Sequence, residues 1–163
     1  MAEASYYTSV LASVAGASKR HLALFNASGS GKTMKIYRIR AAGAPTAAVT
    51  GLVIALNAVR ITTAPTGGGA GTIDKGVTSD AAPPAQVTVM TAATGGATEE
   101  ANAFGVGTVT GEETQGASAV IIYDAVIDGL KPLTCAEGQG VLVKQGALAS
   151  AGAVNILIWF SLV

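Results

Sequence analysis

The chain has 163 residues, with ten basic and ten acidic side chains and a formal net charge of zero. Half of its residues are hydrophobic and 12% are charged, about half the charged share of an average soluble domain. The length suits one domain with a sizeable core, and the lack of a basic excess argues against binding to nucleic acid.

A chain with so few charges has little polar surface to offer to water. We therefore expect it to bury part of its surface against copies of itself, as a homo-oligomer. A monomer with an Ala-rich surface is the alternative. No apolar run reaches the length of a membrane-spanning helix, so no membrane partner is expected. The first residues lack the basic and apolar regions of a signal peptide, which predicts synthesis in a cytoplasm.

Residues 1–20 are expected to form an N-terminal arm or a first strand, ahead of a domain that spans residues 21–163. The β-branched and aromatic side chains at 6–14 suit an extended segment, and a short helix is the alternative. If this segment is an arm, it is a candidate for reaching a neighbouring subunit.

The next two predicted strands, at 21–25 and 33–41, are joined by a turn at 26–32 that is rich in Asn, Ser and Gly. This pattern predicts a β-hairpin. Four apolar side chains alternate toward one face and are expected in the core: Leu22, Leu24, Met34 and Ile36. The alternation slips near Arg38 and Ile39, which predicts a β-bulge there.

Six further strands are predicted downstream. Their ranges are 49–63, 86–91, 104–110, 118–127, 140–145 and 154–163. The Gly- and Pro-rich segment 65–84 is expected to be a long functional or mobile loop. The last two strands are expected to form a hairpin around residues 146–152. About eight strands without an amphipathic helix predict an all-β, single-domain antiparallel sandwich or barrel.

The last predicted strand carries large apolar groups on both faces. Val154, Ile156, Ile158 and Phe160 alternate with Asn155, Leu157, Trp159 and Ser161. Such a strand has to be covered on both sides, so Leu157 and Trp159 are candidate residues of a subunit interface.

The segment Gly31-Lys32-Thr33 is similar to the core of a nucleotide-binding P-loop. However, Asn26 stands where that motif has its first glycine, and the residues after Thr33 predict a strand instead of a helix. Without a helix N-terminus we expect no cluster of backbone N–H groups for phosphate. A P-loop nucleotide-binding protein therefore remains only a remote alternative.

The same stretch is more simply a basic strand. Its candidate partner-docking residues are Lys32, Lys35, Arg38 and Arg40. Two interpretations stay open, a docking patch for an acidic partner surface and a solvated charged edge.

Catalytic and metal-binding constellations are weak in this sequence. Glu112 and Glu113 are adjacent acids, and Asp124 and Asp128 lack the pattern of a calcium loop, so solvated charges and ion pairs are the simpler interpretation. A serine-based triad would have to use the single histidine, His21, which begins a strand. We expect no enzyme, no metal and no cofactor.

The single cysteine, Cys135, excludes an intrachain disulfide and is expected to be a small buried residue.

Two segments, 22–40 and 133–162, carry a resemblance to a known group. The first runs through Phe25-Asn26 and a Ser/Gly turn into a basic strand. The second contains Leu133-Thr134-Cys135-Ala136-Glu137-Gly138-Gln139-Gly140-Val141-Leu142-Val143, followed by a small-residue turn and a closing apolar strand. In this order of features the chain resembles the small jelly-roll proteins of tailed bacteriophages, which include capsid cement, or decoration, proteins.

The resemblance implies a jelly roll of about eight strands that forms a homotrimer on the outer surface of a virion. There it would bind the major capsid protein and stabilise the capsid lattice. The same fold occurs in receptor- or carbohydrate-binding head domains of phage tails and fibres, which is the alternative function.

Overall fold

A computed structural model describes residues 4–44, 51–111 and 118–163, and this part of the chain is all-β. The eight longest strands are β1 (Ala4–Val14), β2 (Arg20–Asn26), β3 (Met34–Ala44), β4 (Leu52–Ile61), β8 (Glu99–Gly111), β9 (Ala119–Asp124), β11 (Gln139–Gln145) and β12 (Ala153–Leu162). The shorter strands are β5 (Gly69–Ala70), β6 (Asp74–Lys75), β7 (Val87–Thr91) and β10 (Leu133–Cys135). The described residues thus contain twelve strands, and the predicted number of about eight matches only the long ones.

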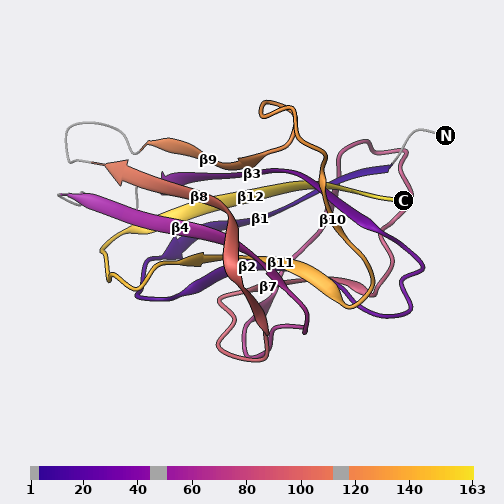
Figure 1. Ribbon diagram of the computed structural model, residues 1–163, viewed down its shortest axis with the longest axis horizontal. Coiled ribbons are helices and arrows are strands. Elements are labelled where there is room, and N and C mark those ends of the chain that lie inside the picture. The colour runs from indigo at the N-terminus through magenta and orange to yellow at the C-terminus, as the bar shows by residue number, and fades with distance from the viewer. Residues whose placement is uncertain (1–3, 45–50, 112–117) are drawn as a thin grey trace.

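The strands form two antiparallel sheets that pack face to face (Figure 1). Sheet A has the order β10-β3-β12-β1-β6, with β9 also paired to β3, and sheet B has the order β5-β7-β2-β11-β4-β8. The long strands therefore run β9-β3-β12-β1 in one sheet and β8-β4-β11-β2 in the other. This is the two-sheet arrangement of a jelly roll, so the predicted all-β sandwich is confirmed.

The core between the sheets follows from the alternation of side chains along each strand. In β12, Val154, Ile156, Ile158 and Phe160 point inward and are at most 1% exposed. All four core residues expected from the sequence, Leu22, Leu24, Met34 and Ile36, are fully buried.

Strand β2 is buried on both faces. Its other face, with Ala23 and Phe25, joins Val59, Ile61 and Leu142 in a second small apolar cluster outside sheet B. Ala27 and Ala97 pack against this cluster. One face of sheet B is therefore covered in part by the chain's own connections.

Both predicted hairpins are wrong. Strand β2 lies in sheet B and β3 in sheet A, and β11 and β12 are separated in the same way. The turns at 26–32 and 146–152 do reverse the chain, but each carries it from one sheet to the other. The reason is that β11 pairs with β2 and β4, whereas β12 pairs with β1 and β3.

The N-terminal segment forms a first strand and not a projecting arm. Residues 4–14 make β1, which pairs along its length with β12. The segment 65–84 also lies against its own domain: the Thr8 hydroxyl donates to the Thr72 carbonyl at 2.6 Å, and the Tyr6 hydroxyl donates to Ala81 O at 3.0 Å. The described residues of both segments therefore contact sheet A of their own chain. The expected strand at 49–63 is β4, and its first two residues lie outside the described part.

Candidate partner-binding face

A β-bulge in β3 decides which way its arginines point. Trp159 of β12 lies opposite Arg38, but Phe160 lies opposite Ile36, so β3 has one extra residue at Tyr37. Strict alternation after Met34 and Ile36 would turn Arg38 and Arg40 into the core. The extra residue turns both arginines outward and brings Ile39 inward, where it is fully buried. The bulge predicted near Arg38 is confirmed.

The outward residues of neighbouring strands line up in rows across sheet A. One row runs from Tyr7 of β1 through Trp159 and Arg38 to Asp124 of β9. The next row contains Ser9, Leu157, Arg40 and Ile121. Directly opposed residues share a face of a sheet, so these two rows define one surface, called here the outer face of sheet A.

Trp159 stands between two apolar grooves on the outer face of sheet A. One groove, of about 390 Å³, is lined by Leu11, Arg40, Ala42, Ala119 and Leu157 among others. The other, of about 290 Å³, is lined by Tyr37, Arg38, Val126 and Phe160 among others. Trp159 borders both grooves and is half-buried.

Arg38 is not free to bind a partner anion, because it forms an ion pair with Asp124. The Asp124 carboxylate is 1% exposed and also accepts hydrogen bonds from the N–H groups of Val126 and Ile127 at 3.0 and 3.1 Å. Burial alone would raise the pKa of Asp124. The hydrogen bonds from Ile127, Arg38 and Val126 outweigh it and hold that pKa below its ordinary value.

Arg40 is the exposed cation of the outer face. Its guanidinium carbon lies 5.9 Å from the centre of the Trp159 ring, which is a cation–π distance. Within residues 4–44, 51–111 and 118–163 it forms no ion pair with a carboxylate. Arg40 therefore offers a positive charge at the edge of an apolar groove.

The structure brings most of the predicted site residues together. Lys35, Arg38 and Arg40, expected to dock a partner, share the outer face with Leu157 and Trp159, expected at a subunit interface. Lys35 is half-buried and lies opposite Ser161. Lys32 does not belong to this face, because it is exposed in the connection between β2 and β3. The residues expected to dock a partner and those expected at a subunit interface therefore lie on one face, with Lys32 alone in a loop.

Several residues of the face could not be recognised from the sequence. Leu11 is 73% exposed, Val126 is 67% exposed and Ile121 is 42% exposed. In the sequence each one looks like a core residue of an apolar strand. Ile121 shares the face of its partner Arg40, and Leu11 lies in an irregular stretch of β1 between Val10 and Ser13, where it is exposed.

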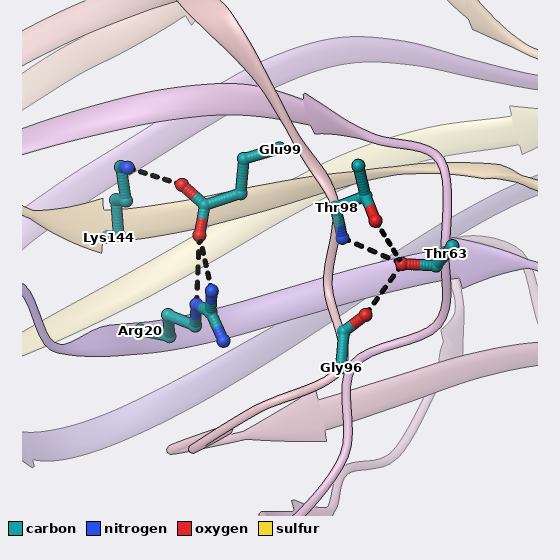
Figure 2. A network of polar contacts seen from close by, with 6 residues as sticks. All are labelled: Arg20, Thr63, Gly96, Thr98, Glu99 and Lys144. Atoms are coloured by element: carbon teal, nitrogen blue, oxygen red, sulfur yellow. Dashed lines mark hydrogen bonds and ion pairs between the residues drawn. The ribbon is translucent and has the colours of Figure 1, made fainter.

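A second polar cluster lies on sheet B. Figure 2 shows the Glu99 carboxylate between Arg20 and Lys144, which come from β2 and β11. Nε and a terminal nitrogen of Arg20 donate to one Glu99 oxygen at 2.9 and 2.8 Å, and Lys144 pairs with the other oxygen. This contact could not be inferred from the sequence, since the three residues are far apart along the chain.

A hydrogen-bonded turn beside Glu99 fixes its approach to sheet B. The Thr63 hydroxyl donates to Gly96 O at 2.6 Å and accepts from Thr98 N–H at 2.7 Å (Figure 2). Glu99 then begins β8 and extends across Arg20 and Lys144. Burial would raise the pKa of Glu99, but Lys144 and Arg20 outweigh it and lower that pKa.

The Gly29–Lys32 segment differs from the expectation in an informative way. A strand follows it and not a helix, as predicted. The expected lack of an N–H cluster is wrong, however: Gly29 and Gly31 N–H both donate to the Glu137 carboxylate, at 3.1 and 2.6 Å. The loop therefore does hold an anion, and that anion belongs to the chain itself.

Three further candidate residues from the sequence, Cys135, His21 and Asp124, are buried. The Cys135 side chain is buried as expected, and burial raises its pKa to about 11. His21 is buried with its Nδ1 2.8 Å from the Ser13 hydroxyl. Among the described residues no group of His, Cys, Asp and Glu could hold a metal ion, and Asp124 is engaged by Arg38. Glu112 and Glu113 lie outside the described residues.

No family model matches the chain, and no curated protein or solved structure matches it either. In the described part of the chain there is no helix long and apolar enough to cross a membrane.

Proposed function

We propose that this chain is a structural protein that assembles with copies of itself through the outer face of sheet A. The observation that carries this proposal is the position of Trp159, half-buried between two apolar grooves with the Arg40 cation beside it. Tryptophan and arginine are the residues most enriched among the energetic centres of protein interfaces. A partner side chain that fills either groove would cover Trp159 and Leu157 together.

The separation of Lys32 from this face gives the protein a second contact region. The outer face of sheet A serves the contact between copies, and the exposed Lys32 loop at the end of the sandwich remains accessible for another partner. An assembly with both contacts binds many sites at once, so modest affinity at each site gives strong overall attachment.

The particular role we propose is that of a capsid cement, or decoration, protein of a tailed bacteriophage. The support comes from the jelly-roll arrangement of the sheets together with the resemblance of segments 22–40 and 133–162 to that group. In this role the chain forms a homotrimer on the virion surface. Each trimer binds adjacent major capsid proteins and stabilises the lattice.

The first experiment measures the mass of the protein in solution by light scattering over a range of concentrations. We expect a mass three times that of one chain for the wild type and a shift toward monomer for Trp159→Ala and Leu157→Glu. Val106→Glu is the matched control, because Val106 is 66% exposed on β8 of the other sheet. A wild-type monomer at all concentrations, with no affinity for capsid shells, would overturn the proposal.

A receptor- or carbohydrate-binding head domain is the second candidate, and the accessible Trp159 ring beside Arg40 favours it. Sugars stack on aromatic rings, and the groove of about 390 Å³ lies within the usual size of a ligand site. Because Trp159 is the single tryptophan, quenching of its fluorescence by oligosaccharides, with no trimer, would favour this function over the first.

A further inference from the structure

The turn between β2 and β3 has the geometry of an anion-binding cradle. Gly29 and Gly31 both have positive φ angles, of 85° and 64°. Residues in this conformation turn successive backbone N–H groups toward a common point, and such concave arrangements bind anions. Here the Gly29 and Gly31 N–H groups and the Ser30 hydroxyl all point to one carboxylate.

The occupant of the cradle is the Glu137 side chain, from the turn between β10 and β11. One carboxylate oxygen accepts from Gly31 N–H at 2.6 Å and from the Ser30 hydroxyl at 3.3 Å, and the other accepts from Gly29 N–H at 3.1 Å. The hydrogen bonds from Gly29 and Gly31 hold the pKa of Glu137 below its ordinary value. The cradle therefore binds the ionised form of a carboxylate.

The cradle is also accessible. Glu137, Gly29 and Gly31 are exposed, and apart from the chain neighbours no residue has an atom within 4 Å of the position that a Cβ would take on either glycine. The exposed Lys32 follows directly in the chain, so the approaching anion meets a positive charge. A carboxylate from outside could reach the cradle if Glu137 moved away.

We propose that Gly29, Ser30 and Gly31 form a carboxylate-binding site that Glu137 fills in the free protein and that an acidic side chain of a partner can fill in its place. The identity of the partner rests on the proposed function, whereas the carboxylate site itself does not. Glu137 then acts as an internal substitute ligand that keeps the loop in its binding conformation.

The test uses Glu137→Ala, in which the cradle loses its occupant, and acetate as the probe. Backbone amide signals of ¹⁵N-labelled protein are followed by NMR near neutral pH. We expect the Gly29 and Gly31 signals of Glu137→Ala to move saturably with acetate and to stay unchanged with acetamide, which has the same shape without the charge. In the wild type the same shifts should require roughly tenfold more acetate or more, because the tethered Glu137 competes.

Glu100→Ala is the matched control, since Glu100 is an exposed acid elsewhere in the chain and leaves the cradle filled. If Glu137→Ala does not fold, as judged from the dispersion of its amide signals, Glu137→Gln replaces it. Any of three results would overturn the site. The Gly29 and Gly31 signals could stay in place when acetate is added to the folded variant, they could move equally in the wild type, or they could respond equally to acetamide. A positive result with a monomeric wild type would leave the carboxylate site standing and refute only the proposed assembly.

Discussion

The guanidinium of Arg40 lies 5.9 Å from the ring centre of Trp159, although 119 positions separate the two residues in the chain. The contact joins β3 to β12 on the outer face of sheet A, and it depends on the bulge at Tyr37 that turns Arg40 outward. A cation and an aromatic ring held together beside an apolar groove form the most specific feature of this face.

Replacing Arg40 by alanine should remove this contact and change the emission of the single tryptophan. At an exposed site we expect the free energy of unfolding to fall by about 0.5–1 kcal/mol. Fluorescence of the native state and chemical denaturation measure the two effects. Arg40→Lys should retain part of the contact, and Lys131→Ala, at another exposed site, should leave the emission unchanged. An identical spectrum for Arg40→Ala would contradict the contact.

Deleting Tyr37 should leave the protein folded, because the deletion removes the extra residue of the bulge and Arg38 then follows Ile36 directly. In a regular strand of that sequence Arg38 and Arg40 still point outward and Ile39 still points inward. Ile39→Asp should instead prevent folding, because it places an unpaired charge at a fully buried position. Circular dichroism and resistance to proteolysis distinguish the two variants. An unfolded deletion variant would contradict this account of the bulge.

Glu99→Gln should destabilise the protein, because Arg20 and Lys144 would lose the carboxylate between them. All three side chains are half-buried, so we expect a loss of about 1–2 kcal/mol in the free energy of unfolding. Urea denaturation at pH 7 measures it. Glu100→Gln is the control on the next residue and should change stability by less than about 0.5 kcal/mol. Equal effects of the two substitutions would mean that the Glu99 network adds no stability.

Stability should decline as the pH falls from about 6.5 to about 4, because of His21. Burial, and then the nearby Lys19, lower the pKa of His21 to about 4 from an ordinary value of 6.5. Between these two pH values the unfolded chain binds a proton at His21 that the native protein does not bind. The contribution of His21 to the free energy of unfolding is therefore full above pH 6.5 and decreases as the pH falls below 6.5. The largest loss from this residue is about 3 kcal/mol.

Chemical denaturation at pH 7, 6, 5 and 4.5 measures how the free energy of unfolding depends on pH. His21→Gln should weaken this dependence. Asp124, Glu99 and Glu137 have lowered pKa values, so their contributions are lost only at lower pH. An unchanged slope in the variant would place the responsible group elsewhere.

Local pattern was sufficient to predict the long strands and part of the core. Leu22, Leu24, Met34 and Ile36 were identified because side chains alternate across a strand, and this alternation holds in whichever sheet the strand lies. The slip in alternation also located the bulge to within one or two residues. The all-β class followed from many short apolar segments separated by Gly, Pro and Asn.

Strand pairing could not be predicted, since a turn in the sequence indicates a reversal of the chain and not the partner of the next strand. The residues 26–32 look the same whether the following strand pairs with β2 or crosses to the opposite sheet. The two groups of candidate residues could not be joined for the same reason: nothing in the sequence shows that β3, with Lys35, Arg38 and Arg40, lies beside β12, with Leu157 and Trp159.

The sequence by itself determined the long strands and the inward-facing residues of several of them, because these depend on local alternation. Only the tertiary structure decided which outward residues meet, because strand pairing is a contact between distant parts of the chain. It placed Arg40 beside Trp159 and Glu99 between Arg20 and Lys144, and it filled the Gly29–Gly31 cradle with the carboxylate of Glu137.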